Sequence, residues 1–138
     1  MKTVYKESVT YAKDHDELNK WRESHQANVR CKEAIEADIR DNYRDNRLKT
    51  DGSTVIKEFG VERVAWVVAS TIRDKDWDGR VSRENKAWAA TVYPDALMDE
   101  EPSLRAALYI NSHSVLLDGY ADSVRKTLEK SRNIDIER

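Results

Sequence analysis

The sequence has little of what marks secreted, membrane-spanning or nucleotide-binding proteins. Cys31 is the only cysteine, so no disulfide can form within the chain. No apolar run approaches the roughly 20 residues of a transmembrane helix, and none of signal-peptide length follows Met1. The four glycines are scattered singly, which excludes the glycine-rich loops that cradle phosphates. We therefore expect a cytoplasmic protein that does not contact membranes and carries no nucleotide loop.

Neither sign of charge dominates. The 24 basic and 26 acidic residues give a formal net charge of -2, and they are interspersed along the chain. A nucleic-acid binder usually carries a basic stripe, whereas a protein that imitates DNA needs a large acidic excess. Both functions are therefore disfavoured.

The residues that most often perform catalysis do not form a recognisable constellation. His15 and His25 are ten positions apart and share no metal-ligand spacing. His113 lies between two serines at an expected helix start, and no carboxylate can be assigned to it as a partner. Cys31 falls on an apolar helical stripe, which favours a buried thiol over a nucleophile. We expect no catalytic residue, no cofactor and no enzymatic activity.

What the sequence does contain is enough apolar material for one core. Apolar residues make up 39% and charged residues 36% of the chain, and a chain of this length fits one domain without disulfides. The pattern predicts a mainly α-helical single domain over residues 1–138. We expect this domain to be a bundle of about five to six helices, with a tail that frays at about 131–138.

In the first third of the chain, helical periodicity is clear. Ser8 is expected to cap a short helix, and Asp14 or Asp16 the next one. From Leu18 to Tyr43, apolar residues recur at three- and four-residue spacing, which indicates one long amphipathic helix or two in tandem.

The centre of the chain is its most apolar part. Ser53 is expected to cap a short helix that Gly60 ends. Residues 61–72 are apolar nearly all round, which describes a central, buried helix. A buried strand is the alternative, but the length and the flanking caps favour a helix.

After the centre, the pattern is less regular. Ser82 is expected to cap a helix that Pro94 closes. Residues 93–104 hold both prolines and an acidic run, so a mobile loop is expected there. Either an extended segment or a helical turn fits 104–110, and the conformation of 93–112 stays open. Ser112 is expected to cap the last helix.

The stretch DKDWDGRVSREN resembles the calcium loop of an EF-hand, with aspartates at alternate positions ahead of a glycine. The position of the bidentate glutamate is held by Asn85, which offers one neutral oxygen, and a positive charge lies beside the expected ion. We therefore keep calcium as the alternative only. Its ligands would be Asp74, Asp76, Asp78, the Arg80 backbone carbonyl, Ser82 and Asn85.

The same stretch has a simpler interpretation as a tight turn between two helices. Trp77 in the loop and Trp88 on the following helix lie near Arg80 in sequence, and tryptophan with arginine is typical of interface hot spots. These residues, with Asp78, form either a partner-binding surface or a fold-defining turn. In the second case Arg80 pairs with an aspartate and packs on a ring. We favour the turn.

Four runs resemble the uncharacterised domain-of-unknown-function family 3849 (DUF3849). They cover most of the chain in order, and DWDGRVSRENKAWA is the most distinctive; the others are VYKESVTYAKDHDEL, ANVRCKEAIEADIRDNY and NSHSVLLDGYADSVRK. Members are similar in being carried on conjugative elements and phages of gut Firmicutes. The chain departs from them at Asp74, where members have an apolar residue, and at Ser114, where they have proline.

The resemblance implies a small accessory protein of mobile DNA. Such proteins often act on host defences by binding a protein, so it implies an anti-CRISPR or antirestriction role, with a host defence nuclease as the partner. We expect a non-enzymatic protein that binds a partner stoichiometrically. The calcium-binding helix-loop-helix is the alternative from a different class.

Overall fold

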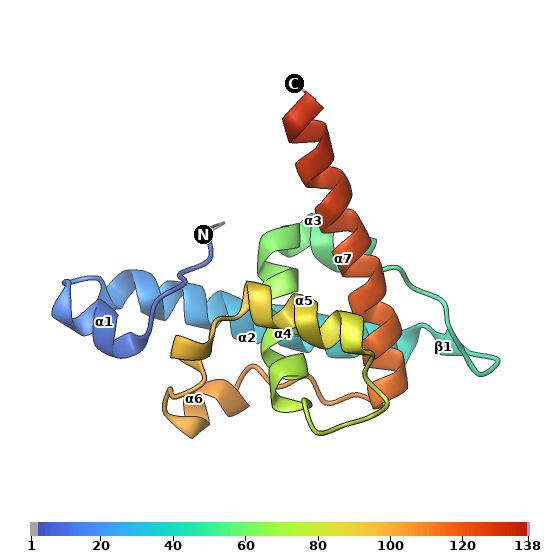
Figure 1. The fold of residues 1–138 in the computed structure, drawn as a ribbon, viewed down its shortest axis with the longest axis horizontal. Coiled ribbons are helices and arrows are strands. Elements are labelled where there is room, and N and C mark those ends of the chain that lie inside the picture. The colour runs from blue at the N-terminus through green and yellow to red at the C-terminus, as the bar shows by residue number, and fades with distance from the viewer. Residues whose placement is uncertain (1–2, 138) are drawn as a thin grey trace.

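The structure is a computed structural model that describes the backbone of residues 3–137 and the side chains of residues 3–131. Within this part of the chain there are seven α-helices, five of them with seven residues or more, and one two-stranded hairpin (Figure 1). The mainly helical fold in one domain is confirmed. In chain order the elements are α1 (Val9–Asp14), α2 (Leu18–Asp41), β1 (Tyr43–Arg44), β2 (Arg47–Leu48), α3 (Ser53–Phe59), α4 (Val61–Asp74), α5 (Arg83–Val92), the 3-10 helix η1 (Asp95–Leu97), α6 (Pro102–Ala106) and α7 (Ser114–Glu137).

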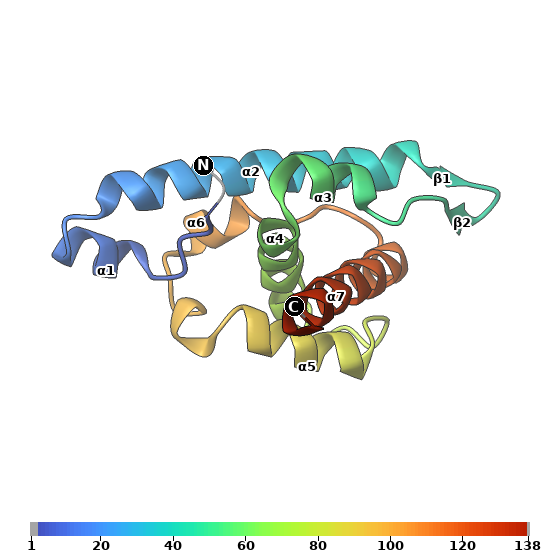
Figure 2. The same ribbon diagram turned by 90° about the horizontal axis from the view of Figure 1, so that it is seen from above.

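Helix α4 occupies the centre, as its sequence predicts. Figure 2 shows it crossing between α2 on one side and α5 on the other, and it also packs on α3 and α7. Every residue from Arg63 to Ile72 is buried, because a helix that is apolar all round must be covered on every side. No helix of the described residues is both long enough and apolar enough to cross a membrane.

Helix α2 is one continuous element, which settles the choice between one helix and two. Its buried face includes Cys31, Ile35 and Ile39, and burial raises the pKa of the Cys31 thiol to about 12. The residues predicted to cap the start of α2 were wrong. Asp14 is the last residue of α1. Asp16 lies in the turn between α1 and α2 with a positive φ of 55°, so neither aspartate is the N-cap of α2.

The prediction that the apolar stripe continues to Tyr43 was wrong. Tyr43 lies in the hairpin and is 44% exposed. Asp45 and Asn46 turn the chain with φ of 54° and 62°, the left-handed pair of a type I′ turn, which Asp and Asn tolerate better than most residues. The Asp-Asn pair was the sequence signal for this hairpin.

The start of α3 also differs from the prediction. Its cap is Gly52, with φ of 78°, and Ser53 is the first helical residue. The Ser53 N–H is instead accepted by the Asp51 carboxylate at 3.0 Å. Gly52 lies against Tyr120, whose hydroxyl donates to Asp38 on α2 at 3.0 Å. A glycine is therefore needed here for both its backbone angle and its size.

Ser8 and Ser82 cap α1 and α5 as predicted, accepting N–H groups at 3.0 and 3.2 Å. The prediction for α7 was wrong. Nδ1 of His113 accepts the Val115 N–H at 3.2 Å, one residue after the expected cap. The Ser112 hydroxyl donates to the His113 carbonyl instead.

The segment expected to be a loop contains two short helical turns, η1 and α6. Part of 104–110 is therefore helical, and the chain from Ala107 to the start of α7 is irregular. The backbone of α7 runs to Glu137, through the tail expected to fray. Side chains from residue 132 on lie outside the described residues.

Two glycine substitutions test this fold. We expect Gly52→Ala to destabilise the protein by about 1–2 kcal/mol from its left-handed backbone alone, and by more because the new Cβ would lie 3.1 Å from the Tyr120 ring. Gly119→Ala is the matched control. It lies in α7 with open space around the new Cβ and should stabilise by about 1 kcal/mol. Urea unfolding measures both, and equal effects would contradict the role given to Gly52.

Candidate functional site

The loop between α4 and α5 is a compact turn rather than an extended one. The Asp78 N–H donates to the Lys75 carbonyl at 2.9 Å, and the Val81 N–H donates to the Asp78 carbonyl at 3.2 Å. The Val81 side chain is buried in the core. Two consecutive turns therefore return the chain to the core before α5 begins.

The Asp78 carboxylate is the centre of this turn. Its Oδ1 accepts the Arg80 backbone N–H and the Arg80 Nε, both at 3.0 Å. Its Oδ2 accepts Arg80 Nη2 at 2.9 Å and the Ser114 hydroxyl at 2.6 Å. Ser114 Oγ also accepts from Lys75 Nζ at 3.0 Å. The turn is thus attached to the first residue of α7.

These contacts explain the acidity of Asp78. The hydrogen bonds from Arg80, then from Ser114, hold the pKa of this carboxyl well below its usual range, because they stabilise the charged form. The pairing of Arg80 with an aspartate agrees with the sequence interpretation. About half of the Arg80 side chain remains exposed.

Asn85 points away from the loop and towards α7. It is fully buried, and its Nδ2 donates to the Asp118 carboxylate at 2.7 Å and to the Asp122 carboxylate at 2.9 Å. Asp118 also accepts the Ser82 N–H at 2.9 Å. Sequence reasoning missed both aspartates, although their spacing of four puts them on one helix face.

The first aspartate of the loop has a different partner again. Asp74 contacts Arg105 at 2.8 Å. Burial raises the pKa of Asp74, and the Arg105 charge opposes that rise. Arg105, which the sequence did not single out, is itself buried and lies over the Tyr93 ring at 5.2 Å.

The side chains proposed to bind calcium therefore do not converge. Asp74 faces Arg105, Asp78 faces Arg80 and Ser114, and Asn85 faces α7, while Asp76 is exposed. Over the described residues, no group of three or more His, Cys, Asp or Glu side chains is placed to hold a metal ion. Calcium binding stays a hypothesis that this geometry does not favour.

The two tryptophans of the predicted site differ in burial. Trp77 is 76% exposed, and its indole N–H donates to the Asp74 carbonyl at 3.2 Å. Trp88 is half-buried and packs against the core. Val115, which follows Ser114, is 54% exposed. Trp77 directly precedes Asp78, and Val115 directly follows Ser114. Asp78 and Ser114 are hydrogen-bonded to each other, so both exposed residues neighbour this contact in sequence.

The three histidine rings make separate local contacts. His15 stacks on Tyr11 with the ring centroids 3.8 Å apart, and His25 stacks on Trp21 at 4.8 Å. His113 caps α7. Each ring has a local structural contact.

Comparison with known families decides one point. Residues 4–129 match the model of the family described as "Protein of unknown function (DUF3849)". The chain belongs to this family. No curated protein and no solved structure matches it. The matched stretch of this DUF3849 protein includes the whole α4–α5 loop and most of α7.

The Asp78 contacts predict a specific pH dependence. Because the folded pKa is lowered, the stabilisation is complete above the unfolded value of about 3.9 and is lost as the pH falls from there through the folded pKa. We expect Asp78→Asn to unfold at lower urea concentration than the wild type at pH 7. The difference should narrow below about pH 4.

Asp76→Asn, an exposed position in the same loop, is the matched control and should leave the unfolding midpoint unchanged. A difference between Asp78→Asn and wild type that is constant from pH 7 to pH 3 would contradict the role of the carboxylate charge.

Calcium is tested separately. A ligand that binds only the folded state raises its stability, so a functional site would raise the melting temperature at millimolar calcium. We expect no change, measured by calorimetry against magnesium as the control ion. A saturable rise that Asp76→Asn abolishes would support the calcium hypothesis.

Proposed function

We propose that this DUF3849 protein acts in the cytoplasm, without enzymatic activity, by binding a protein partner stoichiometrically through a surface centred on Trp77. The observation that supports this most is the 76% exposure of the Trp77 side chain. Exposing so large an apolar group to water is unfavourable, and tryptophan is strongly enriched among the residues that dominate binding energy.

Trp77 is held in place before any partner arrives. Its indole N–H is bonded to the Asp74 carbonyl, and the next residue, Asp78, is fixed to Arg80 and Ser114. A side chain that is already ordered loses little conformational entropy on binding. The surface, which we call the Trp77 face, is defined by Trp77 and the exposed half of the Arg80 side chain, both in the α4–α5 loop.

The charges indicate what kind of partner fits. Arg80 is exposed, but Asp78 already engages its Nε and Nη2, so a partner carboxylate would have to compete with that pair. An apolar pocket that receives Trp77 requires no such exchange. We therefore favour a partner with an apolar pocket and a polar rim.

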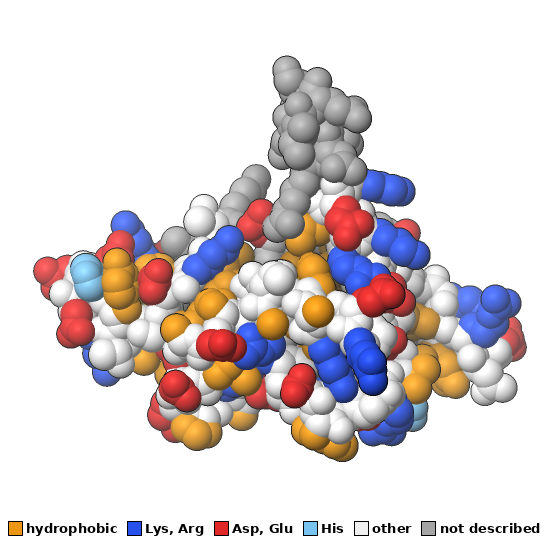
Figure 3. Space-filling model, viewed as in Figure 1, with side chains coloured by type: hydrophobic (Ala, Val, Ile, Leu, Met, Phe, Trp, Pro, Cys, Tyr) orange, Lys and Arg blue, Asp and Glu red, His pale blue; other side chains and the backbone are white. Residues whose placement is uncertain are grey.

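The wider surface supports a protein partner over nucleic acid. Acidic side chains lie among the basic ones over the face shown in Figure 3, including beside the basic side chains that gather near the start of α5, and hydrophobic atoms project at its lower edge, where Figure 1 places the α4–α5 loop. A nucleic-acid site would need clustered basic residues.

The family context supports the class of partner. The chain resembles proteins carried on conjugative elements and phages of Firmicutes, and small accessory proteins of mobile DNA often block host defences by binding them. We propose a host defence nuclease as the partner, which makes the protein an anti-CRISPR or antirestriction inhibitor.

Binding and inhibition can be measured with three forms of the protein. Immobilised wild type should retain a CRISPR effector or restriction nuclease at low and moderate salt and inhibit its cleavage of DNA. Trp77→Ala should weaken binding at least about tenfold, as hot-spot truncations do, with an unchanged melting temperature.

Tyr43→Ala is the matched control, because Tyr43 is also an exposed aromatic residue but lies on the hairpin. It should bind like the wild type. An equal loss of nuclease binding in both variants, or inhibition that persists in Trp77→Ala, would contradict the role proposed for the Trp77 face. Failure of the wild type to bind any such nuclease would contradict the proposed partner.

A further inference from the structure

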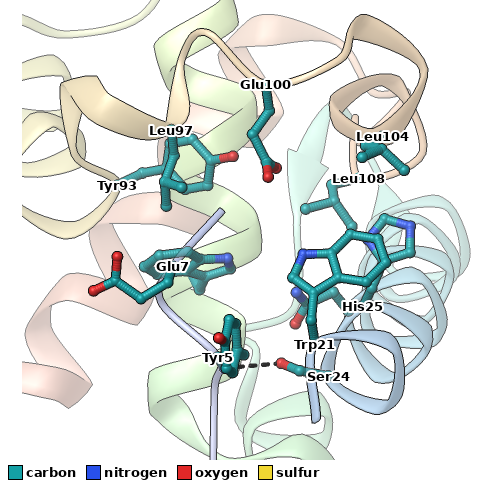
Figure 4. Close-up of a pocket in the computed structure, with 12 residues that line it drawn as sticks. Tyr5, Glu7, Trp21, Ser24, His25, Tyr93, Leu97, Glu100, Leu104 and Leu108 are labelled. Atoms are coloured by element: carbon teal, nitrogen blue, oxygen red, sulfur yellow. Dashed lines mark hydrogen bonds between the residues drawn. The ribbon is translucent and has the colours of Figure 1, made fainter. Parts of the chain in front are cut away.

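A small cavity away from the Trp77 face is surrounded by aromatic rings. Its volume is about 20 Å³, and it lies between the N-terminal segment, α2, α4 and the chain that leads from α5 to α6 (Figure 4). The rings of Tyr5, Trp21, Trp66 and Tyr93 line it. The space suits a group the size of one water molecule.

The rings are held by contacts outside the cavity. Trp66 and Tyr93 contact each other at a tilt of 59°, with centroids 4.9 Å apart. The Tyr5 N–H donates to Ser24 Oγ at 2.9 Å, and its hydroxyl donates to Glu17 at 3.0 Å. The walls are therefore formed before a ligand binds.

Glu100 brings negative charge to this space. Figure 4 shows its carboxylate pointing into the cavity, and its Oε1 accepts the Val9 N–H at 2.8 Å. Glu7 lies on another wall with its carboxylate turned outwards. Glu7 is exposed, so the cavity reaches solvent beside it.

The positive groups nearby are accounted for. Arg63 lies behind the wall, where its Nη1 donates to Ser24 and Asn28 and its Nη2 donates to the Thr3 carbonyl. Burial lowers the pKa of His25, which favours the neutral ring. Arg105 lies over the Tyr93 ring at 5.2 Å and is paired with Asp74. Both guanidinium groups are thus engaged by other acceptors, and the Glu100 carboxylate and the ring faces that line the cavity give this space its negative character.

We propose that this aromatic cage binds a primary alkylammonium group, either of a free amine or of a lysine side chain. An ammonium head has about the size of water, is attracted by ring faces and forms a strong charge-assisted hydrogen bond with a carboxylate. A quaternary ammonium is too large for the cavity. The alkyl chain would leave beside Glu7.

The test uses n-butylammonium chloride at constant ionic strength and follows the indole N–H signals by NMR. The Trp21 and Trp66 signals should shift and saturate, while those of Trp77 and Trp88 serve as internal references. The neutral probe n-butanol and the oversized probe tetramethylammonium should give no saturable shift. Equal response to n-butanol would overturn the proposal, because it would show that the cavity does not select for the ammonium charge.

A substitution tests the carboxylate. Glu100→Gln keeps an oxygen that can accept from Val9 but removes the charge, and should weaken n-butylammonium binding about tenfold. Asp99→Asn, the exposed neighbour, should bind like the wild type. Unchanged affinity in Glu100→Gln, with folding confirmed by its NMR spectrum, would also overturn the proposal.

A second pair of probes distinguishes the two possible sources of the ammonium group, a free amine and a lysine side chain. Lysine blocked at both backbone ends, with its side-chain ammonium free, should shift the same signals if a protein lysine is the ligand, and its Nε-acetylated form should not. Binding of n-butylammonium without blocked lysine would assign the cage to free amines. Trp77→Ala should respond normally throughout, which separates this site from the proposed partner surface.

Discussion

Because α4 is covered on every side, two of the polar side chains that it carries into the core, Arg63 and Thr71, take their hydrogen-bond partners from distant parts of the chain. Arg63 donates to Ser24 on α2 and to the carbonyl of Thr3. Thr71 Oγ1 accepts the Ile110 N–H at 3.0 Å and donates to the Leu108 carbonyl at 3.3 Å. A buried polar group without a partner costs more than a made hydrogen bond gains. The burial of α4 therefore determines where the N-terminal segment and the chain before α7 must run.

The loop that follows α4 extends this dependence to the surface. Its turn is attached to α7 through Asp78 and Ser114, and α5 is attached to α7 through Asn85. These contacts hold the loop against α7 with the Trp77 side chain in solvent. The Trp77 face is thus a consequence of how α7 packs, and a change at the start of α7 would move it.

The aromatic cage depends on a different long-range contact. Glu100 belongs to the connection between η1 and α6, inside the range 93–104 that holds both prolines and was expected to be a loop. Its bond to the Val9 N–H joins that segment to the start of α1, 91 positions away, while Trp66 reaches the same cavity from α4. The cage exists only because the N-terminal segment and this connection meet over α2.

The sequence by itself determined the helical fold, the central place of α4, the apolar stripe of α2 and the caps at Ser8 and Ser82, because periodicity and capping are local; that α2 is one helix was decided by the structure. It also indicated that Asn85 does not complete a calcium loop. Only the tertiary structure decided that Asn85 binds Asp118 and Asp122, that Asp74 faces Arg105, and that Trp77 is exposed while Trp88 packs inwards. These outcomes depend on burial or on contacts between residues more than 30 positions apart. Neither can be predicted from the local sequence around each residue.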